Sequence, residues 1–397
     1  MKITCIETLI LKAPLGSKEK FWSSQATFPE RKCLLVRIET DAGILGWGEA
    51  GQYGPAEPVV SHIHDVLAPL LLGANPLEPA VHWERMYNHT RDYGAKGSII
   101  EAISGIDIAL WDILGKARQA PVYELMGGAF RTGVRTYATG LYYRGEESPT
   151  LADNLPKLRE EAAKYRDAGF PAVKTKIGLL TPPEDVERVA ETREVLGKDT
   201  LIMVDANHAY NAHTASQVAR AIEPLDIYWF EEPVVPEDME GYRQVKASTT
   251  IAIAGGECEH TRYGFARWFA GRAIDIVQPD ICAAGGLTEL RRIAAMASAF
   301  HIQCMPHVWG SGVSIAAGLQ LLATLPPSPH AAIPHAPYNA PMLEWDAGTN
   351  PLRTDLLRNS PHPESGSVRV PAEPGIGADV NLDVVERFLT NRRTTRE

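Results

Sequence analysis

Two lysines in a strand-like run have a spacing that could serve chemistry. Lys174 and Lys176 lie one residue apart in AVKTKIG, residues 172–178. Residues i and i+2 of a β-strand point to the same face, so the two ammonium groups would be held side by side at a cost in electrostatic repulsion. A neighbouring positive charge lowers the pKa of a lysine and helps it to act as a base. The alternative is a solvated lysine pair on an edge strand, where lysines oppose aggregation.

Ionisable residues also close the strand-like runs that follow. After Lys176 they are, in chain order, Asp205, Glu231, Glu257, Asp280, His307 and Glu344, with successive members 23 to 37 residues apart. This spacing is about one strand–helix unit, and the C-terminal ends of successive strands of a parallel barrel meet at one mouth. A single acid could equally cap a helix or pair with a surface base. The repeated register predicts an active site at a barrel mouth.

Three of these carboxylates indicate a metal site. Asp205, Glu231 and Glu257 come from three adjacent units. In a partly desolvated mouth they would repel one another, and their pKa values would rise unless a cation neutralised them. Hard oxygen ligands of this kind suit Mg²⁺, with water and substrate oxygens in the remaining positions.

A metal site beside two lysines indicates removal of the proton α to a carboxylate. That proton is very weakly acidic, so the reaction needs both charge stabilisation and a positioned base such as Lys176. His307 would face the other side of the substrate, and a hydrogen bond from its ring to Asp280 would fix its tautomer and raise its basicity. Glu344 would either hold a proton for the enediolate oxygen or pair with a lysine.

The elements that must position these residues change character along the chain. Residues 1–127 form strands with a hairpin turn at 41–43, followed by helices that end at two glycines, which predicts an α+β unit. Residues 128–350 alternate strand-like and helical stretches, which predicts a (β/α) barrel. The expected strands are 134–140, 172–178, 201–207, 227–233, 251–257, 274–280, 302–307 and 340–345. Residues 351–397 are expected to return to the first unit through a final helix near 382–390.

The composition is that of a globular protein, since 45% of the 397 residues are hydrophobic and 22% are charged. No apolar run approaches the ~18 residues of a membrane span, and the N-terminus resembles a strand rather than a signal peptide, so we expect no membrane association. The net charge of −10 and the lack of a basic run argue against nucleic-acid binding. Five cysteines without a CxxC pair fit reduced thiols in a cytoplasmic protein.

The order of the motifs points to a known family. The sequence contains, in turn, VKTKIG, VDANH, WFEEP, AGGE, QPD followed by two glycines, MPH and MLE. In this order and spacing the chain resembles the enolase superfamily, and within it the mandelate racemase subgroup, over essentially its whole length. The resemblance implies a modified (β/α)7β TIM-like barrel, residues 128–350, under an N-terminal α+β capping domain, residues 1–127.

The resemblance also implies a role for each matched residue. Asp205, Glu231 and Glu257 would bind Mg²⁺. Lys176 and His307 would be the two acid/base groups, with Asp280 supporting the histidine. The remaining matched residues are Lys174, which would tune Lys176 and contact the substrate carboxylate, Glu344, an electrophile at that carboxylate, and Asn207, beside metal and substrate. Further substrate contacts are expected from the capping loops at 14–30 and 50–55 and from two barrel loops, through Trp22, Gln25, Gln52, Tyr53, His208 and Trp309.

These loops look most like those of subgroup members that act on acid sugars, the galactarolactone cycloisomerases and the sugar-acid dehydratases. The implied reaction is Mg²⁺-dependent removal of the proton α to the carboxylate of an acid sugar or its lactone, giving an enediolate, followed by β-elimination. Loss of a hydroxyl would make the enzyme a hydro-lyase, and loss of a lactone ring oxygen would make it an isomerase. Return of the proton by the opposite base would instead make it a racemase or epimerase of a 2-hydroxy acid that uses Lys176 and His307.

Two other readings explain less of the sequence. A barrel glycosidase would use two of the acids but leaves both lysines and the third acid unexplained. A non-enzymatic binding protein on an inherited barrel leaves the whole set of candidate base, metal ligands and electrophile unexplained. The family likeness further implies a homo-oligomer, either a dimer or an octamer.

Overall fold

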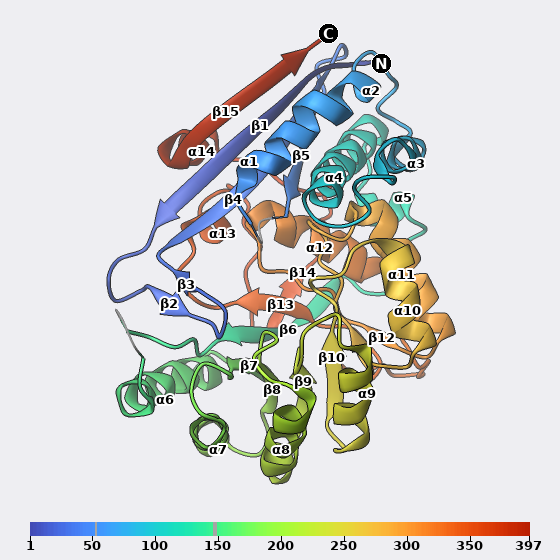
Figure 1. Ribbon diagram of the computed structural model, residues 1–397. Helices are drawn as coiled ribbons and strands as arrows, with labels where there is room; N and C mark the ends of the chain where they lie inside the picture. Colours follow the sequence, from blue (N-terminus) through green and yellow to red (C-terminus); the bar gives the residue numbers. More distant parts are fainter. Residues whose placement is uncertain (52–53, 146–148) are drawn as a thin grey trace.

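The structure, a computed structural model, describes residues 1–51, 54–145 and 149–397. An antiparallel sheet with its helices forms the upper part of the molecule in Figure 1, and parallel strands surrounded by helices form the lower part. Both ends of the chain lie in the upper part, because the C-terminal strand pairs with the N-terminal one. This arrangement confirms the expected α/β architecture, a capping domain over a (β/α) barrel.

The capping sheet has four antiparallel strands in the order β15-β1-β4-β5. Their bounds are Ile3–Pro14 for β1, Glu30–Thr40 for β4, Leu45–Ala50 for β5 and Leu389–Arg396 for β15. Side chains alternate between the two faces of a strand. In β1, Ile6 and Ile10 pack in the cluster of the capping helices, whereas Leu9 and Leu11 pack in the cluster of the barrel. The sheet is therefore buried on both faces, which explains its nearly continuous apolar runs.

Helices cover the outer face of this sheet. They are α1 (Ala56–Ser61), α2 (Ala68–Leu71), α3 (Pro79–Thr90) and α4 (Ser98–Arg118), with a π-helical turn at His62–Leu67 and α5 (Val122–Leu125) leading to the barrel. Helix α4 lies very close to β5 at Gly48, where only the absence of a side chain allows the contact. A Cβ atom there would come within 2.0 Å of the Gly105 carbonyl oxygen. In the described part of the chain, no helix has the length and apolar character needed to cross a lipid bilayer.

Eight parallel strands form the barrel, in the order β13-β6-β7-β8-β9-β10-β11-β12. They are β6 (Gly133–Gly140), β7 (Ala172–Lys176), β8 (Leu201–Asp205), β9 (Ile227–Glu231), β10 (Ala252–Gly255), β11 (Ile276–Val277), β12 (Gln303–Cys304) and β13 (Leu343–Asp346). The two ends of this series meet after β12, where the Val308 backbone N–H donates to Glu344 Oε2 at 3.3 Å. Side chains, rather than a strand ladder, thus span the seam among the described residues.

Helices alternate with these strands around the barrel. They are α6 (Leu151–Asp167), α7 (Pro182–Leu196), α8 (Ala212–Ile222), α9 (Met239–Ala247), α10 (Thr261–Ala270), α11 (Gly286–Ala299) and α12 (Gly312–Thr324). After β13 the chain forms α13 (Pro351–Thr354), β14 (Ser367–Arg369), which pairs with β6, and α14 (Leu382–Phe388) before it reaches β15.

Each expected strand overlaps an observed one, but several observed strands are shorter. Asp280 and His307 lie beyond the ends of β11 and β12 and face each other in an isolated parallel bridge. Strand β15 was not predicted, because its sequence LTNRRTTR is polar and is stabilised by pairing with β1. A short hairpin in the expected capping loop, β2 (Phe21–Trp22) with β3 (Thr27–Phe28), was not predicted either.

The β2–β3 hairpin rests on the barrel mouth through its turn. Ser24 Oγ donates to the carbonyl oxygen of Ala206 at 2.6 Å, and Gln25 Nε2 donates to that of Asn207 at 2.5 Å. Both acceptors directly follow β8. The capping domain is thereby tied to the loop that carries one of the predicted metal ligands.

A second junction joins α4 to the start of α11. The buried Asp107 carboxylate accepts hydrogen bonds from the Thr288 backbone N–H at 2.9 Å and from Thr288 Oγ1 at 2.6 Å. Gly286 has φ of +74°, and a Cβ there would lie 2.6 Å from Asp107 Oδ2, so only glycine fits. Burial raises the pKa of Asp107 from 3.8 to about 7.

We predict that this junction makes stability depend on pH. The unfolded chain releases the Asp107 proton near its ordinary pKa of 3.8, whereas the folded chain keeps it until about 7, so the group's contribution to stability falls as pH rises through that window. Asp107→Asn keeps an acceptor and a donor for Thr288 but does not titrate. We expect the variant to gain stability relative to wild type between pH 4 and 7, by up to a few kcal/mol, in denaturant unfolding. Asp92→Asn, at a side chain 92% exposed, serves as control. Parallel stability curves for Asp107→Asn and wild type would contradict the prediction.

Candidate active site

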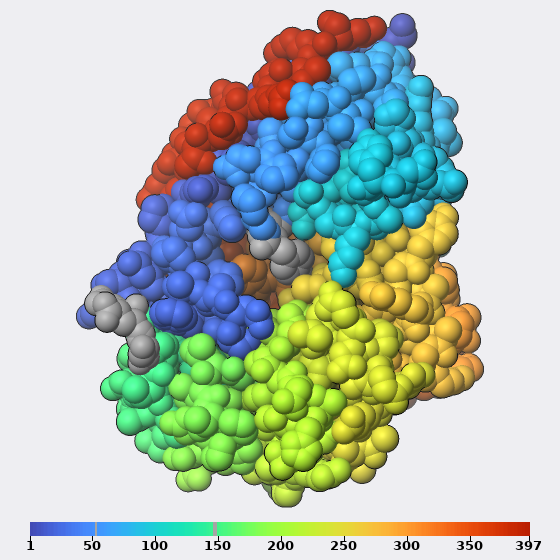
Figure 2. All heavy atoms as spheres, viewed as in Figure 1, coloured from blue at the N-terminus to red at the C-terminus, as the bar shows by residue number. Residues whose placement is uncertain are grey.

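A cavity of about 610 Å³ lies between the capping domain and the barrel mouth. Figure 2 shows the surface hollowed between the capping domain, in blue, and the barrel, in green and yellow. The barrel contributes Lys176, Asn207, His208, Glu257, Asp280, His307, Trp309 and Glu344, and the capping domain contributes Phe21, Gln25, Phe28 and Arg31 among others. Most of the ionisable residues that the register predicted therefore meet at one cavity.

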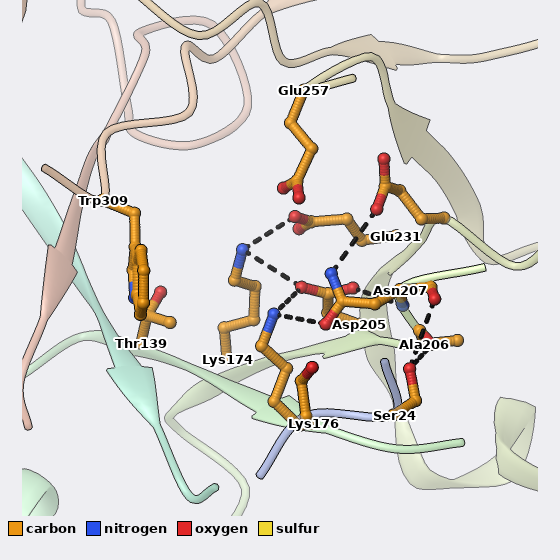
Figure 3. Close-up of polar contacts among 12 residues, drawn as sticks. Ser24, Thr139, Lys174, Lys176, Asp205, Ala206, Asn207, Glu231, Glu257 and Trp309 are labelled. Atoms are coloured by element: carbon orange, nitrogen blue, oxygen red, sulfur yellow. Dashed lines mark hydrogen bonds and ion pairs between the residues drawn. The ribbon is translucent and has the colours of Figure 1, made fainter. Parts of the chain in front are cut away.

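The three predicted metal ligands lie together at the ends of β8, β9 and β10. One oxygen from each of Asp205, Glu231 and Glu257 lies within 4.8 Å of the other two, and all three residues are buried. In Figure 3 the side chains of Lys174 and Lys176 reach towards Asp205 and Glu231 from below, and Glu257 points in from above. Three carboxylates in so small a volume repel one another, and this repulsion sets the electrostatics of the site.

The two lysines differ in their access to the cavity. Lys174 Nζ is enclosed, 2.7 Å from Glu231 Oε1 and 2.9 Å from Glu344 Oε1, and it does not line the cavity. Lys176 Nζ contacts Asp205 and lies 2.8 Å from Asn207 Oδ1, and it does line the cavity. Lys174 thus serves as a buried counter-ion for two carboxylates, and Lys176 is the lysine that a substrate could reach. The direct contact of Lys174 with the substrate that the resemblance implied has no support in this arrangement.

The expected lowering of the Lys176 pKa is outweighed by the carboxylates. Burial lowers this pKa and so does the repulsion from Lys174, but the attraction of Asp205, with Glu257 and Glu231, raises it, and the net direction is upward. The sequence interpretation considered only Lys174, because the contact with Asp205 depends on the packing of β7 beside β8. The same ion pairs hold the pKa of Asp205 at about 2 despite its burial.

His307 pairs with Asp280 as expected, and other acids surround it as well. Its Nδ1 lies 2.6 Å from Asp280 Oδ2, and its Nε2 lies 3.3 Å from Glu257 Oε2. Burial alone would lower the pKa of His307, but Glu257, Glu344 and Asp280 together raise it to about 10. This shift favours the imidazolium form of His307, which lines the same cavity as Lys176.

The carboxylate trio has the chemistry that a hard divalent cation requires. It offers three anionic oxygens, the ligand type that Mg²⁺ prefers. Glu257 Oε2 is buried, and among the described residues it has the ion pair with His307 Nε2 at 3.3 Å but accepts no hydrogen bond of good geometry. Repulsion among the buried carboxylates is evident at Glu231. Burial and its acidic neighbours raise its pKa to about 7 although Lys174 lies beside it. The residues therefore fit a divalent cation.

Four of the seven predicted substrate-contacting residues line the cavity, and they are Gln25, Asn207, His208 and Trp309. Tyr53, like Gln52, lies outside the described residues. Trp22 does not line the cavity in the described part of the chain, and its indole N–H donates to the Gly145 carbonyl oxygen at 3.0 Å. Phe21, its neighbour in β2, lines the cavity instead, because adjacent residues of a strand face opposite sides.

A second cluster lies directly beside the trio. His208 Nε2 is 3.1 Å from Glu232 Oε2 and 3.6 Å from Cys258 Sγ. Burial and the nearby carboxylates raise the pKa of Glu232 well above its usual value. Asn207, His208 and Glu232 have φ angles of 42°, 65° and 45°, a strained backbone of the kind found at functional sites. Sequence reasoning found Asn207 and His208 but had no signal for Glu232 or Cys258.

Sequence reasoning also missed the residues that shape the far wall of the cavity. Arg31, Phe28 and Tyr142 line it, and none follows a motif at a strand end. Glu49 of β5 has a structural role nearby, since it accepts hydrogen bonds from the backbone N–H groups of Ser311 and Ser314 at the start of α12. These residues come from the capping domain and the first barrel strand, so only the folded structure shows that they meet.

The comparisons with known proteins agree with this architecture. Residues 5–127 match the mandelate racemase/muconate lactonizing enzyme N-terminal domain, and residues 157–384 match the enolase C-terminal domain-like family. The D-galactarolactone cycloisomerase of Agrobacterium fabrum is 39% identical over 98% of this chain and 99% of its own. The arabinonate dehydratase of Saccharolobus solfataricus is 36% identical over 89% of this chain and 90% of its own.

Solved structures show the same likeness. The 3,6-anhydro-D-galactonate cycloisomerase from Zobellia galactanivorans superposes with a TM-score of 0.86 at 39% identity, over 98% of this chain and 100% of that one. A racemase from Streptomyces coelicolor with bound magnesium superposes with a TM-score of 0.84 at 28% identity, over 98% and 100%. With both domains matched and the whole length aligned, the chain belongs to the mandelate racemase/muconate lactonizing enzyme family and is an enzyme of the enolase superfamily.

Proposed function

We propose that the enzyme uses Mg²⁺ to remove the proton α to the carboxylate of an acid sugar or its lactone and then eliminates the β-substituent. The observation that carries the proposal is the placement of Lys176 and His307. Both line the cavity, and each touches a different member of the carboxylate trio, Lys176 at Asp205 and His307 at Glu257. A substrate carboxylate bound at the trio would have one ionisable group on each side of its α-carbon.

The residues of the chain divide the work between them. Asp205, Glu231 and Glu257 would hold the ion, which supplies positive charge where negative charge develops on the substrate carboxylate. Lys176, held by Asn207 and Asp205, would take the α-proton as a free amine or return it as an ammonium group. His307, held by Asp280, would donate a proton to the departing oxygen in its imidazolium form, or accept one from the opposite side in its neutral form. Lys174 balances Glu231 and Glu344 from beneath.

The relatives support the substrate class. Their names describe a galactarolactone cycloisomerase, an arabinonate dehydratase, a D-xylonate dehydratase and a D-galactonate dehydratase. Each of those substrates is a sugar-derived acid or its lactone, and each name denotes a β-elimination or a ring rearrangement. A cavity that combines Asn207, His208 and Gln25 with aromatic side chains suits a polyhydroxylated acid.

Racemisation or epimerisation of a 2-hydroxy acid is the second candidate, because two ionisable groups, Lys176 and His307, line the same cavity. If no β-group leaves, the residue opposite the base can return the proton to the other face of the α-carbon. The product distinguishes the two candidates, since elimination gives a 2-keto-3-deoxy acid and racemisation gives only a stereoisomer.

Metal binding is the first prediction from this site. We expect calorimetry on EDTA-treated protein to show one Mg²⁺ bound per chain, and Glu257→Gln to weaken binding by at least about 10-fold, the scale seen when even an outer partner of a metal ligand is lost. Glu240→Gln, at a side chain 77% exposed, is the matched control. Cys258→Ser tests which cluster holds the ion. Loss of Mg²⁺ binding in Cys258→Ser with retention in Glu257→Gln would place the ion in the His208 cluster and contradict the proposal.

Exchange of the α-proton tests the chemistry itself. In D₂O, we expect the wild type to incorporate deuterium at the α-carbon of at least one acid in a sugar-acid library, and Lys176→Met or His307→Asn to lower turnover by about 10²- to 10⁴-fold, the usual worth of a general base or acid. The residue that removes the proton is the one whose loss stops exchange as well as product formation. Lys164→Met, at a side chain 68% exposed, should behave as wild type. Absence of exchange with every acid, with Mg²⁺ bound, would refute the proposed function.

A further inference from the structure

The cavity has a second polar end, distant from the carboxylate trio. Glu344 and Asp346 lie two residues apart on β13, so their side chains share a face about 6–7 Å apart along the strand. Glu344 belongs to the reacting end, where it pairs with Lys174 and lies 3.8 Å from His307 Nε2. Asp346 does not line the cavity itself but pairs with Arg31, which does, and its separation from Glu344 is comparable with the length of a six-carbon chain.

Arg31 forms the wall of this far end. The residue is only 3% exposed, and its Nη2 lies 2.9 Å from Asp346 Oδ2 while its Nε donates to the Thr349 carbonyl oxygen at 3.0 Å. The guanidinium carbon lies 4.5 Å from the ring centre of Phe21 and 4.8 Å from that of Trp309. Both aromatic residues and Arg31 line the cavity. The fork of Arg31 is thus held rigidly beside the space that a substrate would fill.

One nitrogen of the Arg31 guanidinium group has no hydrogen-bond partner among the described residues. Arg31 Nη1 is buried and donates no hydrogen bond to any of the described residues. An unpaired N–H of a buried guanidinium is costly, and such a group is expected to meet an acceptor in the working enzyme. A carboxylate is the acceptor that a guanidinium fits best, because two parallel N–H groups match two oxygens.

The local charge balance points the same way. Asp346 Oδ2 lies 2.9 Å from Arg31 and also 2.9 Å from Arg353 Nη1, so two buried guanidinium groups share one carboxylate. Its other oxygen accepts from the Tyr142 hydroxyl at 3.2 Å. The charged residues nearby on the cavity wall, Glu30 and Lys32, are partly or fully exposed to solvent and opposite in sign. Arg31, Arg353 and Asp346 together carry one net positive charge, which an anion bound beside Arg31 would neutralise.

We propose that Arg31 binds a second carboxylate of the substrate, so that the preferred acid sugar carries a carboxylate at each end of its carbon chain. This inference rests on the proposed function, because it assumes that the other carboxylate lies at the Asp205–Glu231–Glu257 trio. It makes Arg31 a specificity residue supplied by the capping domain. The relatives' names do not decide this preference, because galactarolactone derives from a six-carbon diacid whereas arabinonate and D-galactonate carry a single carboxylate.

The test compares pairs of six-carbon acids that share one configuration and differ only at C6, a carboxylate in the diacid and a hydroxymethyl group in the monoacid. For the configuration that reacts fastest, we expect the wild-type kcat/KM to favour the diacid by about 10- to 100-fold, the worth of a charge-assisted hydrogen bond. Arg31→Met should bring the ratio close to one by lowering the diacid rate. Arg31→Lys, which keeps the charge without the fork, should retain part of the preference.

Arg353→Met is the matched control, because Arg353 contacts the same Asp346 oxygen but does not line the cavity. It removes one nearby positive charge but no group on the cavity wall, so it should lower the ratio of diacid to monoacid by less than Arg31→Met does, and an equal or larger fall would contradict the role of Arg31. A wild-type enzyme with no preference for diacids would overturn the inference while leaving the proposed function intact. Equal losses for both substrates in Arg31→Met would likewise show that Arg31 only links the two domains. Absence of α-proton exchange with every acid removes both proposals together.

Discussion

The site depends on one buried balance of charge at the C-terminal ends of β7, β8, β9 and β13. Asp205, Glu231 and Glu344, all buried, share Lys174 and Lys176 as counter-ions. Removing a charge from such a set leaves its partner buried and unpaired, which costs several kcal/mol. The parallel register fixes the balance, because Lys176 lies opposite Asp205 and Asp205 opposite Glu231 across neighbouring strands. The fold thus holds carboxylates close enough together to bind a divalent cation.

The capping domain completes this site rather than merely covering it. Its hairpin rests on the loop after β8, Glu49 holds the start of α12, and Arg31 reaches Asp346 at the far end of the cavity. The barrel therefore supplies the reacting groups, and the capping domain supplies much of the wall that meets the rest of the substrate. With the reacting groups on one domain and much of the substrate wall on the other, related proteins can differ in substrate while they share the same reaction chemistry, as expected when one fold carries different sites.

Much of the site could be predicted from the sequence, because its residues repeat at the interval of one strand–helix unit. Asp205, Glu231 and Glu257 meet as that register implies, and His307 pairs with Asp280. Contacts set by packing could not be read from spacing. Lys174 is enclosed and Lys176 is not, and the net effect of Asp205 on Lys176 exceeds that of Lys174. Arg31 follows no motif, and the polar strand β15 is explained only by its partner β1. The homo-oligomer and the exact domain boundaries stay predictions.

The most direct test of the central claim is a crystal structure with Mn²⁺ in place of Mg²⁺ and an unreactive analogue of an acid sugar, with the ion located by anomalous scattering. The account predicts one ion bound by an oxygen from each of Asp205, Glu231 and Glu257. It predicts the α-carbon of the analogue between Lys176 Nζ and His307 Nε2. An ion bound instead by His208, Glu232 and Cys258, or an α-carbon that neither Lys176 nor His307 can reach, would contradict it.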